Sequence, residues 1–134
     1  MLNPFPDLLV YSLAAPFVIR LTVGLIFVRF GALGLSAERH RMAAVCERIG
    51  LRPGAFFGAI CSFLELAAGA MLVVGFYTQI AAIATALFSI ILIVHKLSGK
   101  QFGSEGVLFD LLLFSASISL LLSGAGFLAF DLPL

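Results

Sequence analysis

The chain has 134 residues, of which 62% are hydrophobic and 11% are charged, and its formal net charge is +1. A mean hydropathy of +1.18 excludes a soluble domain, because so short a chain cannot bury that much apolar surface. The small net charge argues against a nucleic-acid partner. We therefore expect a single integral membrane domain, residues 1–134, in contact with the lipid bilayer.

Four apolar segments are each long enough to cross a bilayer. They comprise about residues 8–35, 55–76, 79–97 and 105–123, and short connections join them. Short connections favour antiparallel neighbours, so the sequence predicts an all-α fold, an antiparallel four-helix membrane bundle. In the first span, Gly24, Gly31 and Gly34 mark where a second helix can pack closely.

The segment SAERHRMAAVCERIGLRP, residues 36–53, is strongly charged and separates the first two spans. Ser36 can cap a helix there and Gly50 can end it. One side of this helix would carry Met42, Val45, Cys46 and Ile49. The pattern favours a short amphipathic helix lying on the membrane surface, and a solvated loop with one helical turn is the alternative.

Apart from Arg20 and Arg29 in the first span, the basic residues all lie in two of the connections or directly beside them. The first connection carries Arg39, Arg41, Arg48 and Arg52, and the third carries Lys96 and Lys100. The opposite side, with both termini and the connection around Tyr77, has no Lys or Arg. This asymmetry predicts that the basic connections face the cytoplasm and that both termini are non-cytoplasmic.

The second span has a single carboxylate, Glu65, near its midpoint. It shares a helix face with small and polar residues, namely Gly58, Cys61, Ser62, Ala68, Gly69 and Leu72. A charge at membrane depth costs at least a few kcal/mol unless it faces protein or water and has a partner. We therefore expect Glu65 to point into the bundle.

Depth suggests partners for the charges inside the membrane. At about 1.5 Å per residue, Glu65 would lie roughly 15 Å from the cytoplasmic surface, Arg20 roughly 22 Å and Arg29 roughly 9 Å. Asp110 would lie near the depth of Arg29. We expect a central Arg20–Glu65 pair and a second Arg29–Asp110 pair. The pairs either only fix helix register or line a pocket that binds a quinone or relays protons, with His95 as a further donor or proton carrier.

Other chemistries have little support in the sequence. The two histidines, His40 and His95, lie on different segments, so we expect no metal site and no covalently bound cofactor. Cys46 and Cys61 are fifteen residues apart and form no C-x-x-C motif. This spacing predicts that the chain alone carries out no thiol–disulfide chemistry.

Several short motifs occur in a fixed order along the chain. They are Arg20 with Gly24, Gly31 and Gly34, then IGLRPG, ELAAG from Glu65, GFYTQIAA, His95, and a GAGFLAFD tail. On these motifs, over nearly its whole length, the chain resembles the DoxX-like family of small four-span membrane proteins. It departs from the family at Gly34-Leu35, where Lys-Leu is common, and at Gln79, where Arg is common. The family's fourth-span acid corresponds to either Glu105 or Asp110.

The resemblance implies that the chain is a membrane subunit of a redox system. Relatives form the membrane part of thiosulfate:quinone oxidoreductase, or join complexes that detoxify oxidants and sulfur species. We therefore expect a subunit of a quinone-linked oxidoreductase in a bacterial or archaeal cytoplasmic membrane, with a soluble redox partner at loop 36–54. Whether the chain is itself catalytic, and whether it forms a homo-oligomer, stays open. The alternatives are a non-catalytic scaffold or assembly protein and a small proton-coupled transporter.

Overall fold

The computed structural model describes residues 14–98 and 104–124. The chain forms five helices in these ranges: α1 (Ala14–Leu35), α2 (Arg39–Arg48), α3 (Gly54–Val74), α4 (Thr78–Ser98) and α5 (Ser104–Ser123). All except α2 are long and apolar enough to cross a membrane. The predicted all-α membrane bundle is thus confirmed, and the part of the first span before residue 14 lies outside the described residues.

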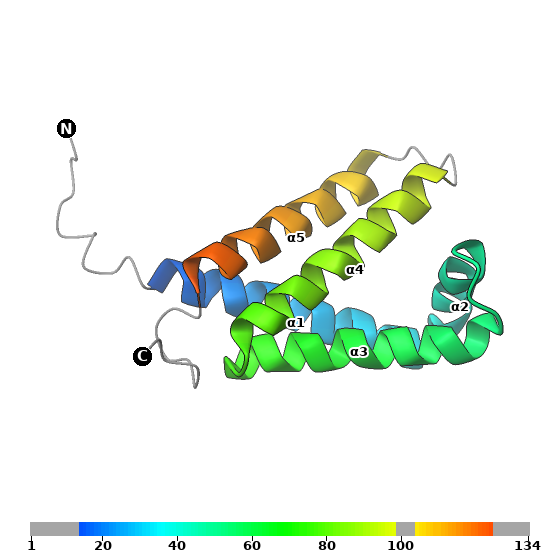
Figure 1. Ribbon diagram of the computed structural model, residues 1–134, viewed down its shortest axis with the longest axis horizontal. Coiled ribbons are helices and arrows are strands. Elements are labelled where there is room, and N and C mark those ends of the chain that lie inside the picture. Colours follow the sequence, from blue (N-terminus) through cyan, green and yellow to red (C-terminus); the bar gives the residue numbers. More distant parts are fainter. Residues whose placement is uncertain (1–13, 99–103, 125–134) are drawn as a thin grey trace.

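The long helices form two antiparallel pairs, α1 with α3 and α4 with α5. The pairs meet near the turn between α3 and α4 and diverge toward the other end of the molecule (Figure 1). The short helix α2 lies at that open end, between the two pairs, and packs mainly on α3. The bundle is therefore closed at one end by helix–helix contact and at the other by α2.

Glycines bring α1 and α3 together, as the sequence predicts. Gly24 lies against Gly69 and Val73, and Gly31 lies against the backbone of Leu66. A Cβ atom at Gly31 would be only 2.5 Å from the Leu66 nitrogen. This pair of helices therefore packs at backbone distance, which small residues permit in a membrane, where no hydrophobic effect holds helices together.

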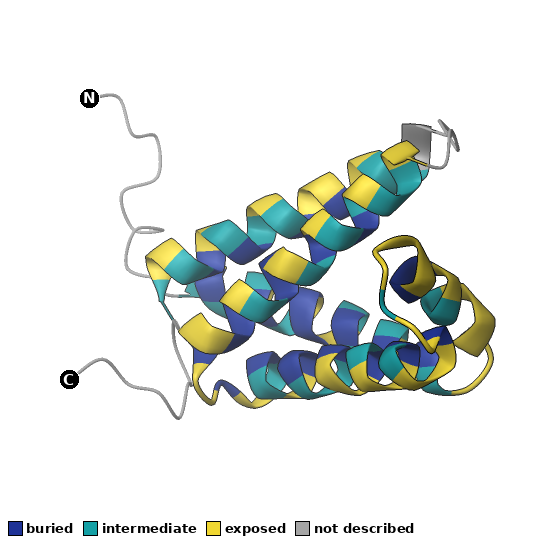
Figure 2. Cartoon of the chain, turned by 45° about the vertical axis from the view of Figure 1, so that its right-hand side comes forward, coloured by how far each residue is buried: buried dark blue, intermediate teal, exposed yellow. Residues whose placement is uncertain are grey.

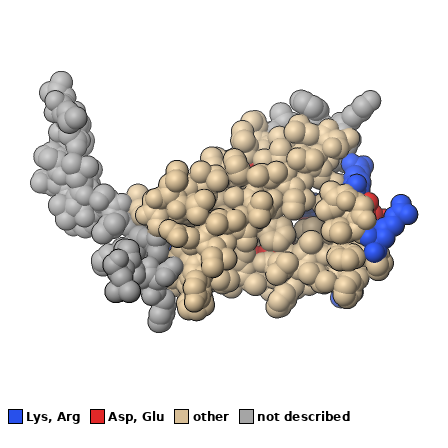
Figure 3. All heavy atoms as spheres, in the orientation of Figure 1, with Lys and Arg blue, Asp and Glu red and all other residues tan. Residues whose placement is uncertain are grey.

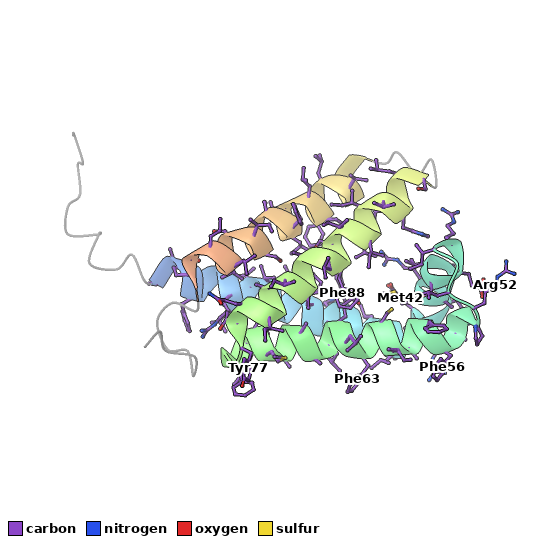
Figure 4. All side chains as sticks on the ribbon, in the orientation of Figure 1. Met42, Arg52, Phe56, Phe63, Tyr77 and Phe88 are labelled. Atoms are coloured by element: carbon purple, nitrogen blue, oxygen red, sulfur yellow. The ribbon has the colours of Figure 1, made fainter. Side chains whose placement is uncertain are left out.

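Exposed residues lie on the outside of the helices and buried ones face the interior of the bundle (Figure 2), and many of the exposed residues are large and apolar. Phe56, Phe63 and Tyr77 point outward and are 62%, 60% and 52% exposed (Figure 4). The buried polar and charged residues are Arg20, Ser62, Glu65, Thr78, Thr85, Ser89, Asp110 and Ser117. Large apolar residues on the outside, with the buried charges held inside, fit a bundle whose solvent is lipid.

Candidate functional site

The short helix α2 forms part of the candidate functional site, and its own position is set by its packing on α3. Gly54 and Gly58 of α3 pack against α2 at Ala43, and Val45 and Cys46 of α2 are buried. The predicted amphipathic helix therefore exists, and Val45 and Cys46 of its apolar side are buried against protein, whereas Ile49 is exposed. Gly50 lies just past the end of α2, where the sequence predicts that the helix ends, and its backbone is left-handed with a φ of +89°.

Ser36 does not cap α2. Its hydroxyl donates to the Ala32 carbonyl at 2.8 Å, and Glu38 is the residue at the N-cap of α2. The predicted cap is therefore wrong, because the chain makes a further turn after α1 before α2 begins.

A cavity of about 60 Å³ lies between the two helix pairs, beneath α2. Its charged lining residues are Glu38, Arg41, Glu65, Lys96 and Asp110, and Phe30 and Phe109 add aromatic walls. These two rings meet edge to face, with centroids 6.2 Å apart. The volume is enough for several water molecules or for the polar end of a small group.

Glu65 lines this cavity and is only 1% exposed. Among the residues that the structure describes, neither of its carboxylate oxygens has a hydrogen-bond partner. The predicted Arg20–Glu65 pair is therefore wrong. A buried acid without a partner is costly, so it indicates a group that receives water or a ligand.

The register of α1 against α3 explains why Arg20 does not reach Glu65. Gly31 lies opposite Leu66, so Glu65 is level with Gly31, and Arg20 is eleven residues away along α1, or about 16 Å. The sequence-based depths assumed that Leu35 and Ala55 lie level. Instead Gly34 lies against Ser62, which displaces α3 by about six residues, or about 9 Å.

Arg20 belongs to the opposite end of the bundle. It is 1% exposed, and its guanidinium carbon lies 5.3 Å from the centre of the Phe17 ring. This geometry is a cation–π contact. Arg20 is therefore buried as predicted, but it is not part of the cavity that contains Glu65.

Asp110 pairs with Lys96, not with Arg29. The Lys96 ammonium lies 2.5 Å from Asp110 Oδ2 and also donates to the Gly106 carbonyl at 3.0 Å. Arg29 is exposed on the outer face of α1, so the predicted Arg29–Asp110 pair is wrong. One signal in the sequence could have found the observed pair: Lys96 and Asp110 lie near the two ends of one short connection between antiparallel helices.

His95 is half-buried at the end of α4, and its Nδ1 has no hydrogen-bond partner within the described residues. It does not line the cavity that contains Glu65. Of the five candidates from the sequence, the structure therefore brings Glu65 and Asp110 to one cavity. Arg20, Arg29 and His95 lie elsewhere. Glu105, the other candidate for the fourth-span acid, has a side chain outside the described residues.

A second, smaller cavity of about 20 Å³ lies on the other side of Glu65, between α2, α3 and α4. Met42 of α2 and Phe88 of α4 point into this region (Figure 4). Cys46 and Cys61 also line the cavity, and their sulfur atoms are 3.9 Å apart. Residue spacing alone predicted no thiol pair. A signal was nevertheless present in the sequence, because each cysteine lies on a helix face predicted to be apolar or small.

The environment of Cys46 keeps its thiol protonated. Burial, together with the charge and hydrogen bond of neighbouring Cys61, raises the pKa of the Cys46 thiol to about 11. At neutral pH this thiol is therefore a weak nucleophile. Within the described ranges, no group of three or more His, Cys, Asp or Glu residues is suited to hold a metal ion.

Four apolar helices around a charged cavity, with a short helix closing one end, define a small four-span integral membrane protein. The family model described as DoxX matches residues 15–97, from the start of α1 almost to the end of α4. The chain therefore belongs to the DoxX family. No curated protein and no solved structure matches it. The helix α5, which carries Asp110, lies beyond the matched residues.

Proposed function

We propose that the chain is the membrane subunit of a quinone-linked oxidoreductase system and that a quinone headgroup binds beside Glu65. The observation that carries this proposal is the buried carboxyl group of Glu65, which has no hydrogen-bond partner among the described residues and lines a cavity within the span formed by α3. Quinones partition into the bilayer and carry two carbonyl groups, so they combine an apolar body with polar atoms that need partners.

The charges around the cavity support a special role for Glu65. Glu38 pairs with Arg41 at 2.8 Å, and Asp110 pairs with Lys96. Each of these acids is neutralised by its own cation, whereas the carboxylate of Glu65 has no hydrogen-bond partner in the part of the chain that the structure describes. Reduction of a quinone consumes two protons with two electrons, so a carboxyl group beside the headgroup has a clear use as a proton carrier.

A soluble partner would supply the electrons. Basic side chains gather at the end of the molecule formed by α2 and the last turn of α4 (Figure 3). By the positive-inside rule this end faces the cytoplasm and both termini lie on the other side. The exposed Arg39 and Arg48 of α2 then offer a basic surface for an acidic partner protein, in a bacterial or archaeal cytoplasmic membrane.

Mass spectrometry of co-purifying lipids tests the proposal. The wild-type chain, Glu65→Gln and the control Glu38→Gln are purified in mild detergent, and the extracted quinone is quantified. We expect near-stoichiometric quinone with the wild type and the control, and little with Glu65→Gln. Absence of quinone from all three folded proteins would contradict the proposal. It would favour a scaffold that presents the arginines of α2 to partners.

A further inference from the structure

The proposed function makes no use of Cys46 and Cys61. Both are free cysteines, and their sulfur atoms are 3.9 Å apart, with the Cys46 thiol donating to Cys61. Cys46 is 1% exposed, and Cys61 is half-buried. One cysteine lies on α2 and the other on α3, so a bond between them would join the short helix to a membrane span.

The closeness of the two thiols follows from how α2 packs. A Cβ atom at Gly58 would be 2.9 Å from the Ala43 nitrogen, so α2 rests on α3 at backbone distance. Cys61 lies one turn further along the same face of α3 as Gly54 and Gly58. The two sulfur atoms are therefore held near each other by the helix–helix contact itself.

We propose that Cys46 and Cys61 are a reversible disulfide site, and that closing it ties α2 to α3 over Glu65. Two S–H bonds break and one S–S bond forms. Cys61, the more exposed thiol, reacts first with a hydroperoxide; with hydrogen peroxide it gives a sulfenic acid and one water, and the Cys46 thiol then displaces a second water to form the disulfide. The sulfur atoms must approach from 3.9 Å to a disulfide length of about 2.05 Å, which calls for side-chain rotation with a small helix shift.

The disulfide would act on the site because α2 forms part of both cavities next to Glu65. Met42 and Val45 of α2 both line the cavity of about 60 Å³ and the cavity of about 20 Å³. Any movement that opens a path past α2 must separate these side chains from α3. A covalent bond one residue from Val45, at Cys46, restricts that separation and so restricts access to Glu65.

The proposed orientation places this pair at the cytoplasmic end of the bundle. Thiols there are kept reduced, and disulfides that form are mostly transient and responsive to oxidants. The resting state is therefore the dithiol, as in the structure. The site does not depend on quinone binding, so its test can succeed or fail separately from that of the proposed function.

The first test asks whether the bond forms. The reduced full-length protein in membranes is treated with hydrogen peroxide, free thiols are alkylated, and peptides are analysed by mass spectrometry. We expect an intramolecular Cys46–Cys61 disulfide that dithiothreitol reverses, and none in Cys46→Ser or Cys61→Ser. Oxidation that yields only sulfinic or sulfonic acids, or only links between chains, would overturn the proposal.

The second test asks whether the bond controls access to Glu65. A hydrophobic carbodiimide modifies carboxyl groups inside membranes, and its attachment to Glu65 is followed by mass spectrometry. We expect several-fold slower labelling of the peroxide-treated wild type than of its reduced form. Peroxide should leave labelling of Cys61→Ser unchanged. Equal rates in the oxidised and reduced wild type would overturn the role of the bond in closing the site.

Discussion

Gly31 of α1 lies against the backbone of Leu66 of α3, and this contact fixes the height of Glu65 in the bundle. It places the carboxyl group of Glu65 under α2 and far from Arg20. The charged cavity and the position of Glu65, whose carboxylate has no hydrogen-bond partner among the described residues, depend on this register of two helices.

Replacement of Gly31 by alanine should weaken the bundle. The added Cβ would be 2.5 Å from the Leu66 nitrogen, so α1 and α3 must separate, and such overpacking costs about 1–3 kcal/mol. Thermal unfolding in detergent measures the loss. The matched control is Gly106→Ala, whose Cβ would be 3.4 Å from the flexible end of Lys96. Equal stability of the two variants would contradict the described packing.

The Lys96–Asp110 pair should be necessary for stability as a unit. Lys96→Met leaves the nearly buried carboxylate of Asp110 without its cation, and we expect a loss on the order of 3 kcal/mol. Adding Asp110→Asn should recover much of it, because the uncompensated charge is removed. A double-mutant cycle measures the coupling. If Arg29→Met proves as destabilising as Lys96→Met, the assigned pair is wrong.

Glu65→Gln should keep the stability of the protein or raise it. The substitution preserves the shape of the side chain and removes a buried charge that has no partner among the described residues. The unfolding midpoint in detergent provides the measurement. A large loss of stability would instead indicate that Glu65 holds the helices together.

Alkylation of Cys46 should be slow at neutral pH and should accelerate strongly with pH. The thiolate is the reactive form, and the pKa of this thiol is raised to about 11, so the rate should rise about tenfold per pH unit up to that value. The titratable groups that line its cavity are Cys61 and Glu65, both from α3, and the α4 side chains there are apolar.

The control for this pH profile is Cys61→Ser, which removes the neighbouring thiol. Because Cys61 contributes to the raised pKa, the profile of Cys46 should move to lower pH in this variant. A rate for wild-type Cys46 that already levels off near pH 9, the ordinary value for a thiol, would show that its environment is not as described.

Much of the fold could be predicted from local patterns. The glycines of α1 and the small, polar face around Glu65 recur at helical spacing, so their burial followed from the sequence. Which residues face one another across α1 and α3 could not be predicted. That register depends on how far α3 extends past the end of α1, and this distance is set by how α2 folds back onto Gly54 and Gly58.

The same limit explains the pairs that the sequence analysis missed. Depth counted from the span ends pointed to Arg20 for Glu65 and to Arg29 for Asp110, but a helix face matters as much as depth, and Arg29 lies on the exposed face. Cys46 and Cys61 meet because α2 packs on α3. The contacts between helices therefore could not be predicted without knowing how the whole bundle packs.

Protection of Glu65 by quinone is the most direct test of the central claim. Glu65 is labelled with a hydrophobic carbodiimide in reduced, quinone-free protein, with and without an added short-chain quinone, and the rate is followed by mass spectrometry. The proposed site predicts that saturating quinone slows the labelling of Glu65 several-fold, whereas exposed Glu47 reacts at the same rate throughout. Unchanged labelling of Glu65 at saturating quinone would contradict a headgroup site beside this residue.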